Sequence, residues 1–377
     1  MRPYVFSFRL SGITIRAEPS WLFLVLIVAW SLAAGFFPDA AAGLSTSTYI
    51  VMAVASALGL SVSVLLHELS HTFVGRAFGL PIRHVTLFIF GGAAELEEEP
   101  DRAMVELVMA IAGPAMSVLL GLVFLALSPA LGAAGIGTAV TAVIDYLALI
   151  NFVLAIFNMI PAFPLDGGRV FRAIAWLVTG DRLTATRIAS YLGEGFAWVL
   201  ILAGAALALF AGMTGAIWWA LIGFFLNSAA RASRFEAEAR VALSGVTAGE
   251  LIAPGTETAE PEMSVRRFID ERLVRHHSDW FPVVDAEGSI VGGAGVNEAR
   301  AVPIADRAAM PVSRIVVKPE TGALAGADER ADHAFIRMRR NGLPRLYVTR
   351  DGRFAGVLTL RDLAEFVRLK ALFDRVG

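Results

Sequence analysis

Long apolar stretches separated by short polar segments dominate the chain up to about residue 228. A membrane-spanning helix needs about 20 mainly apolar residues, so this pattern predicts six transmembrane helices. The stretches cover residues 21–37, 49–66, 104–127, 139–160, 196–211 and 216–227. The last two are short and are joined by only four residues, which predicts a helical hairpin.

The distribution of arginine predicts how these helices are oriented. Arginines lie before the first span, between the second and third, between the fourth and fifth, and after the sixth. The other connecting segments, residues 38–48, 128–138 and 212–215, contain neither Lys nor Arg. Because basic residues concentrate on the cytoplasmic side, we expect a multi-pass protein of the cell membrane with both termini in the cytoplasm.

Residues 85–97 are too few to span a bilayer, and their pattern differs from that of the helices. β-branched and aromatic residues are followed by Gly91 and Gly92, which predicts a small membrane-associated β segment with a turn or a bulge. The two glycines would let the backbone approach another chain closely, as in binding an extended substrate, or they would simply form the turn.

The chain changes character after Arg231, where charged residues become frequent. Two similar stretches, residues 280–293 and 343–357, each read as strand, turn and strand, and each follows a helix-like stretch, residues 265–274 and 331–340. We therefore expect a membrane domain over residues 1–235 and an α+β domain over residues 241–377. The latter would contain two β-α-β-β repeats, at about residues 241–302 and 306–373.

The amino-acid composition limits which metal ligands, cross-links and partners the chain can have. Hydrophobic residues make up 56% of the chain and charged residues 18%, and the net charge of −2 points to no class of partner. The chain has no Cys, which excludes thiolate metal ligands and disulfides. Arg9 and Arg16 interrupt the N-terminal apolar residues, so these do not form a cleavable signal peptide.

A candidate metal-binding motif lies at the end of the second apolar stretch. His67 and His71 are four residues apart, so on a helix both imidazoles leave the same face. That geometry suits two nitrogen ligands on one zinc ion, with Glu68 beside them as the general base. Ionisable groups next to hydrocarbon are costly, which favours a functional site over a chance match.

Catalytic zinc usually has three protein ligands, so the two histidines need a third partner. One alternative is the acidic group that follows the motif by about one loop: Glu95, Glu97, Glu98 and Glu99. The other is Asp166, just after the fourth span, where Pro161 and Pro164 break the helix and Gly167-Gly168 is expected to turn the chain. Such a break can direct one carboxylate into a cavity within the membrane.

With these motifs the sequence resembles the site-2 protease family of intramembrane zinc metalloproteases. The resemblance rests on His67-Glu68-x-x-His71 and on Asn158-x-x-Pro-x-x-Pro-Leu-Asp166-Gly, supported by residues 90–92 and 112–114. It implies that His67, His71 and Asp166 bind one zinc ion, that Glu68 is the base, and that Asn158 helps to hold substrate. Asn151 lies on the same helix face as Asn158, and would assist it or bond a neighbouring helix.

The C-terminal repeats resemble a tandem pair of cystathionine-β-synthase (CBS) domains, which occur in one branch of that family. The pattern Gly356-x-x-Thr359-x-x-Asp362 resembles the one that contacts adenine nucleotides in CBS domains. The alternative is that Thr359 and Asp362 only cap the following helix. The resemblance also implies a homodimer formed through the CBS domains.

The sequence therefore predicts an intramembrane zinc endopeptidase that cleaves transmembrane protein substrates. A nucleotide or the conformation of the CBS pair would modulate it, and no nucleic acid would be involved. The alternative from another class is a CBS-gated ion channel or transporter that uses the intramembrane His and Asp residues, which include Asp145. A catalytically inactive scaffold is a further alternative, against which the intact Glu68 argues.

Overall fold

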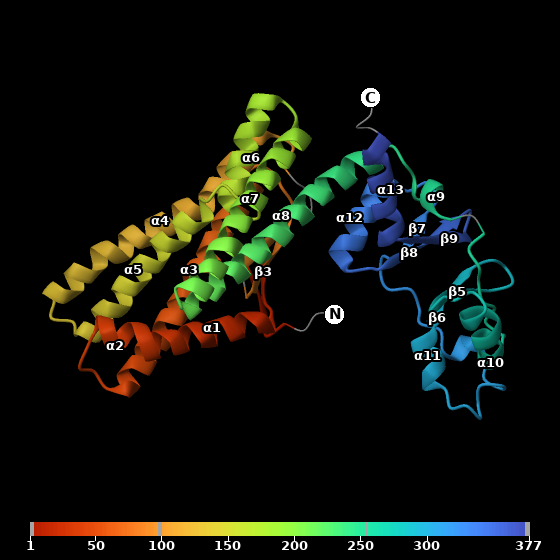
Figure 1. Cartoon of the computed structure of the whole chain (residues 1–377), viewed down its shortest axis with the longest axis horizontal. Helices are drawn as coiled ribbons and strands as arrows, with labels where there is room; N and C mark the ends of the chain where they lie inside the picture. The colour runs from red at the N-terminus through yellow and green to blue at the C-terminus, as the bar shows by residue number, and fades with distance from the viewer. Residues whose placement is uncertain (1–3, 90, 97–99, 254, 374–377) are drawn as a thin grey trace. The chain divides into compact units, whose positions relative to one another are not determined.

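The computed structural model describes residues 4–89, 91–96, 100–253 and 255–373 (Figure 1). The chain divides into two compact units, Met1–Arg234 and Phe235–Gly377, and each has its own hydrophobic core.

The N-terminal unit contains long helices and one four-stranded sheet. Its helices are α1 (Pro19–Ser31), a π-helix (Leu32–Phe36), α2 (Phe37–Ala40), α3 (Thr46–Ala77), α4 (Ala103–Ala133), α5 (Thr138–Asn158), α6 (Asp166–Thr179), α7 (Arg182–Phe210), a 3₁₀ turn (Thr214–Ala216) and α8 (Ile217–Leu243), which continues past the unit boundary. Its strands are β1 (Phe6–Leu10), β2 (Ile13–Ala17), β3 (Ile82–Phe88) and β4 (Gly91–Leu96).

Five helical stretches in the described part of the chain are long and apolar enough to cross a bilayer. They are Pro19–Ala40, Thr46–Ala77, Ala103–Ala133, Thr138–Asn158 and Arg182–Phe210. The predicted sixth span lies in α8, which is not among them and which becomes charged from Arg231 onward. Six spans, and the cytoplasmic side of both termini, therefore remain predictions.

Helix α3 is the centre of the N-terminal unit. Ser45 caps its start by accepting a hydrogen bond from the Thr48 amide at 3.2 Å. Leu69, between the two motif histidines, packs against buried Ile13 and Ile15 of the sheet. Because Leu69 faces the sheet, the histidines two residues to either side of it can face away from the sheet.

The sheet has the strand order β1-β2-β3-β4, in which β2 and β3 are parallel and the other pairs are antiparallel. The predicted strands in residues 85–97 are confirmed as β3 and β4. Strands β1 and β2 were not predicted from the sequence. Both alternate apolar and polar residues but are only five residues long, and Ile13, Ile15 and Ala17 of β2 are buried whereas β1 is exposed.

Helix α5 ends at Asn158, as the two prolines predicted, and the short α6 begins at Asp166. The expectation that Gly167-Gly168 turns the chain is wrong, because both residues lie in the first turn of α6. Their small size serves close packing instead. A Cβ on Gly167 would lie 2.3 Å from the Met159 carbonyl oxygen, and a Cβ on Gly168 would lie 2.6 Å from the Phe163 nitrogen.

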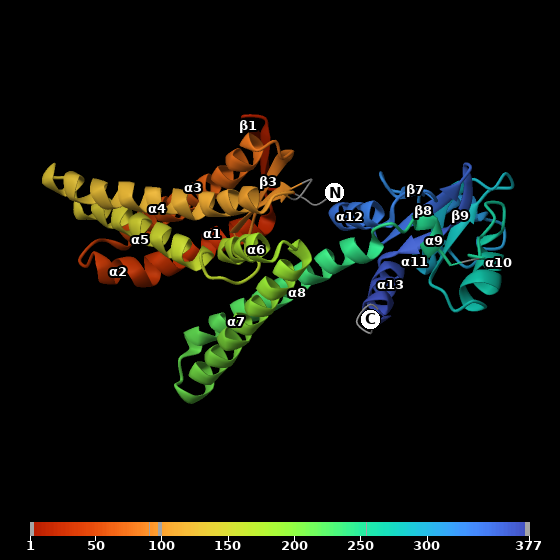
Figure 2. The ribbon, with the colours of Figure 1, turned by 90° about the horizontal axis from the view of Figure 1, so that it is seen from above.

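Helices α7 and α8 form the predicted hairpin. Glycines bring the two helices together, because a Cβ on Gly204 would lie 2.6 Å from the Ala220 nitrogen and one on Gly223 2.7 Å from the Ala197 carbonyl oxygen. In Figure 2 the tip of this hairpin lies away from α3, α4 and α5.

The C-terminal unit consists of two smaller sheets flanked by short helices. Its elements are α9 (Ala248–Leu251), α10 (Val265–Arg267), a π-helix (Phe268–Val274), β5 (Trp280–Val284), β6 (Ile290–Gly295), α11 (Val296–Ala301), a 3₁₀ turn (Val312–Arg314), β7 (Leu324–Gly326), α12 (Ala331–Asn341), β8 (Arg345–Arg350), β9 (Arg353–Thr359) and α13 (Leu360–Phe373).

The two predicted repeats are visible in these elements. In the second repeat β7, α12, β8 and β9 give β-α-β-β, with β7 parallel and β9 antiparallel to β8. In the first repeat Ala259 forms a parallel bridge to Val283 in place of a full strand, and β6 is antiparallel to β5. Each repeat has its own core, around Phe335 in one and Phe268 in the other.

Candidate metal centre

The two motif histidines and Asp166 converge on one point. His67 and His71 lie one turn apart on α3, and both are buried, with 3% and 4% of their surfaces exposed. The Nε2 atom of His67 lies 3.1 Å, and that of His71 3.2 Å, from Oδ2 of Asp166. Asp166 is about a hundred residues further along the chain. It is the first residue of α6 and directly follows the helix break, which places it beside the two histidines.

The far sides of both imidazoles are held by α4. Nδ1 of His67 lies 2.8 Å from the Ser117 hydroxyl oxygen. Nδ1 of His71 lies 2.7 Å from the Met109 carbonyl oxygen, and since a carbonyl can only accept, His71 must donate from Nδ1. A neutral His71 then presents a bare lone pair at Nε2 to the Asp166 carboxylate.

Two acceptors at 3.2 Å repel each other unless a proton or a cation lies between them. Gly113 of α4 keeps the space for a cation open. A Cβ at this position would lie 2.2 Å from His71 Nε2 and 2.5 Å from His67 Nε2. Two imidazole nitrogens, one carboxylate oxygen and an open space beside them fit a zinc ion.

A cavity of about 320 Å³ opens beside these three side chains. Glu68, Asn158 and Arg169 contribute polar groups to its lining, and Phe225 and Ala229 of α8 form part of its wall. Strand β4 comes close to Glu68, because a Cβ on Gly92 would lie 2.3 Å from Glu68 Cγ. Gly91 has φ +128°, a conformation that favours glycine, and has open space around it.

The two asparagines of α5 have different surroundings. Asn158 lines the cavity, and its Nδ2 donates to the Leu154 carbonyl of its own helix at 2.9 Å. Asn151 is fully buried and donates to the Ser63 hydroxyl on α3 at 3.0 Å. Of the two alternatives for Asn151, bonding a neighbouring helix is therefore the one present in the structure.

The acidic alternative for the third ligand falls largely outside the described residues. Glu97, Glu98 and Glu99 are not described, and of Glu95 only the backbone is described, where it pairs with His84 across β3 and β4. Among the described residues, His67, His71 and Asp166 are the one group of His, Asp and Glu side chains close enough to share a metal ion.

Sequence reasoning missed the residues that α4 contributes. Gly113, Ser117 and the buried Glu106 lie on one face of α4, at spacings of seven and four residues. Glu106 accepts hydrogen bonds from Arg172 of α6, with Nε at 2.7 Å from Oε1 and a second guanidinium nitrogen on the same oxygen. A single acidic residue in an otherwise apolar span was the available signal for Glu106.

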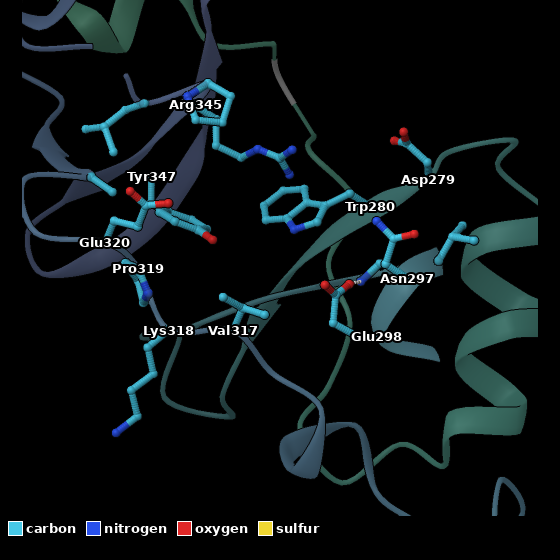
Figure 3. A pocket seen from close by; sticks show the side chains of 15 residues that line it. Asp279, Trp280, Asn297, Glu298, Val317, Lys318, Pro319, Glu320, Arg345 and Tyr347 are labelled. Atoms are coloured by element: carbon cyan, nitrogen blue, oxygen red, sulfur yellow. Dashed lines mark hydrogen bonds between the residues drawn. The ribbon is translucent and has the colours of Figure 1, made fainter. Parts of the chain in front are cut away.

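A second cavity, a cleft of about 300 Å³, lies in the C-terminal unit (Figure 3). Trp280 and Tyr347 lie on its wall with ring centres 5.7 Å apart, and the Arg345 guanidinium lies 3.9 Å from the centre of the Trp280 ring. Burial raises the pKa of the Tyr347 phenol above its ordinary value, which makes loss of its proton still harder. Asn297 and Glu298 approach the cleft from the start of α11.

Thr359 and Asp362 are not among the residues that line this cleft. The Thr359 amide donates to Asp362 Oδ2 at 2.9 Å, and the Asp362 amide donates to the Thr359 hydroxyl at 3.2 Å. This is a reciprocal cap at the start of α13. The capping alternative is therefore present in the structure, and a contact of these residues with nucleotide stays a prediction.

Comparison with known proteins identifies the family. The model of peptidase family M50 matches residues 55–135 and 133–203, which include both metal motifs, and the CBS domain model matches residues 309–369. "Putative zinc metalloprotease Rip3" of Mycobacterium tuberculosis is 31% identical over 360 residues, covering 95% of this chain and 91% of that protein. The chain belongs to peptidase family M50.

Other relatives of this M50 chain cover it almost completely. "Zinc metalloprotease MJ0392" of Methanocaldococcus jannaschii is 28% identical over 372 residues, covering 98% of this chain and 97% of that protein. Among solved structures, a site-2 protease from the same organism matches with 26% identity and a TM-score of 0.41, covering 61% of this chain and 95% of that one. The resemblance to site-2 proteases with a CBS domain, predicted from the motifs, is confirmed.

Proposed function

We propose that this M50 chain is a zinc endopeptidase that cleaves transmembrane segments of other proteins within the membrane. The observation that carries the proposal is the convergence of His67, His71 and Asp166, whose ligand atoms all lie within 4.8 Å of one another around the space that Gly113 leaves open. Family membership favours a peptidase over the alternative of an ion channel.

In this proposal His67 and His71 bind zinc through Nε2 and Asp166 through a carboxylate oxygen. When bound, zinc would supply Lewis acidity, which polarises the scissile carbonyl and makes water acidic enough to lose a proton near neutral pH. Glu68 accepts that proton and returns it to the leaving amine, because it lines the cavity beside His71 and follows the first ligand directly.

The substrate must unwind before it can be cut, since a transmembrane helix hides its amides in internal hydrogen bonds. Strand β4 is the last strand of its sheet among the described residues, so it can accept an extended segment as a further strand. Gly91 and Gly92 would contact that segment with their backbone. Asn158, at the same cavity, would bind its peptide groups.

We further propose that an adenine nucleotide bound to the CBS repeats modulates cleavage, and that these repeats pair two copies of the chain. The cleft beside Trp280 supports nucleotide binding, because it offers aromatic rings for stacking and cations such as Lys318 for phosphate. A tenfold change in cleavage would need about 1.4 kcal/mol of coupling between the two sites.

The cell membrane, with both termini in the cytoplasm, is the proposed location.

The test of this function is cleavage of a model transmembrane substrate by the purified Glu68→Gln variant, with zinc measured in the same sample. General acid–base groups contribute about 10²–10⁴-fold, so cleavage should fall by that factor while zinc stays bound. Asp145→Asn is the matched control, because it also replaces a carboxylate by an amide. Asp145 is exposed on α5 and lies outside the cavity lining, so this variant should cleave normally. Near-normal cleavage by Glu68→Gln would sink the proposed mechanism.

A further inference from the structure

A buried ion pair joins α4 to α6 close to the candidate metal centre. Glu106 of α4 is fully buried, and Arg172 of α6 is 7% exposed. Two nitrogens of the guanidinium donate to the same oxygen, Oε1 of Glu106. The other oxygen, Oε2, is buried and accepts no hydrogen bond from the described residues.

Burying this ion pair costs free energy, so a contribution to the stability of the fold does not by itself explain why it is present. Removing two charges from water costs several kcal/mol per ion, and well-packed apolar residues of similar volume often replace such a pair without loss of stability. The cost is greater beside membrane-spanning segments, where ionisable groups usually serve a function. Neither side chain lines the cavity beside the histidines, so neither can contact a substrate there.

Arg172 is connected to the chain on both sides of Asp166: its side chain contacts a residue before Asp166, and its backbone belongs to the helix that follows. Its guanidinium lies 5.0 Å from the centre of the Phe163 ring, three residues before Asp166. Its own backbone lies six residues after Asp166, on the same short helix. Gly168 packs against the Phe163 backbone between these two points, so the loop and the first turns of α6 form one closely packed piece.

Glu106 fixes this piece to the helix that also holds the histidines. Met109, less than one turn further along α4, accepts the hydrogen bond from His71, and Ser117 lies beside His67. All three proposed ligands are therefore held in place by contacts with α4, a helix that supplies no ligand itself. We propose that Glu106 and Arg172 are positioning residues, which set the Asp166 carboxylate at the right distance from His67 and His71 to bind the metal.

This inference rests on the proposed function and is tested by zinc affinity, measured by competition with a chelator on the purified full-length protein in detergent. Changes in groups that orient metal ligands typically cost about 10–100-fold in affinity, and we expect a loss in that range for Glu106→Gln. Glu194→Gln is the matched control. Glu194 pairs with Arg231 and Arg234 across α7 and α8, so its loss should lower thermal stability while zinc affinity stays unchanged.

A double variant, Glu106→Leu with Arg172→Met, separates positioning from folding. It replaces the charges with apolar packing and should restore the unfolding temperature of the metal-free protein, while zinc affinity stays at least tenfold below that of the wild type. If Glu106→Gln or the double variant bound zinc as tightly as the wild type, the positioning role would be wrong.

Should those variants not fold, Arg172→Lys keeps the charge but loses the paired donors and the contact with Phe163. We expect a three- to tenfold lower zinc affinity for it, and an unchanged affinity would overturn the inference. If the wild type itself bound no zinc, the proposed function would fail instead, and the two failures are therefore distinguishable.

Discussion

The candidate metal centre of the N-terminal unit and the cleft of the C-terminal unit differ in how their polar groups are satisfied. At the candidate metal centre, Nε2 of His71 and Oδ2 of Asp166 lie 3.2 Å apart, a distance at which a proton or a cation must lie between them. In the cleft, Glu298 accepts a hydrogen bond from the Gly295 amide at 2.9 Å, and both residues lie on the cleft wall. The first site therefore leaves a place for a cation between its polar groups, whereas this hydrogen bond in the second site forms without a ligand.

The same contrast applies to the space in each site. Gly113 leaves an opening at the two imidazole nitrogens that any other side chain would fill. In the cleft the Trp280 ring is covered by the guanidinium of Arg345, which a stacking base would have to displace. The metal is therefore expected to bind tightly as part of the folded structure, and a nucleotide to bind weakly enough to act as a signal.

The largest effect is expected from closing the metal space. Gly113→Ala puts a methyl group about where the ion would lie, so zinc affinity should fall by more than the roughly 100-fold upper range for changes around metal ligands. Gly132→Ala on the same helix meets nothing within 4 Å and is the control. Metal analysis of both purified variants checks this. Normal zinc content in Gly113→Ala would show that the ion does not lie between the histidines.

A smaller effect is expected from releasing one imidazole. Ser117→Ala removes the hydroxyl 2.8 Å from His67 Nδ1, and we expect about a tenfold loss of zinc affinity, at the low end for such groups. Ser117→Thr keeps the hydroxyl and should recover most of the affinity. Equal affinities for wild type, Ala and Thr would mean that the hydroxyl does not orient His67.

The smallest effects are expected in the C-terminal unit. Asp362→Ala removes the reciprocal cap of α13 and should cost about 1 kcal/mol of stability, seen as a small drop in unfolding temperature. Calorimetry with ATP, ADP and AMP on the full-length protein, on Asp362→Ala and on Trp280→Ala then locates any nucleotide site. Loss of binding in Trp280→Ala alone would assign it to the cleft, and no heat in the wild type would leave the repeats without this ligand.

The proposed ligands were easier to find from the sequence than the residues that contact them. His67 and His71 are linked by helical spacing, and Asp166 by the proline break before it, so local rules were enough to find them. The contacts of α4 are different. Ser117 is 50 residues from His67, and Glu106 is 66 from Arg172, so no local periodicity joins them. Which of several buried faces meet is decided by packing of the whole unit.

The elements of the fold also divide into those that a local pattern predicts and those that it does not. The long apolar helices and the two repeats were evident from periodicity, whereas β1, β2 and α6 were missed. Strands β1 and β2 are only five residues long, and α6 is a short amphipathic helix directly after the proline break, so none of them stood out beside the long apolar helices. The role of Gly167-Gly168 was misassigned because the sequence shows a glycine but not the backbone that packs against it.

The most direct test of the account is the zinc content of the purified wild type, Asp166→Ala and Glu95→Ala. Asp166 is 8% exposed and lies within 3.2 Å of both imidazole nitrogens, so it should be needed for metal binding, whereas Glu95 should not. We expect one zinc per chain in the wild type and in Glu95→Ala, and a large loss in Asp166→Ala. Zinc retained in Asp166→Ala but lost in Glu95→Ala would contradict the account and assign the third ligand to β4.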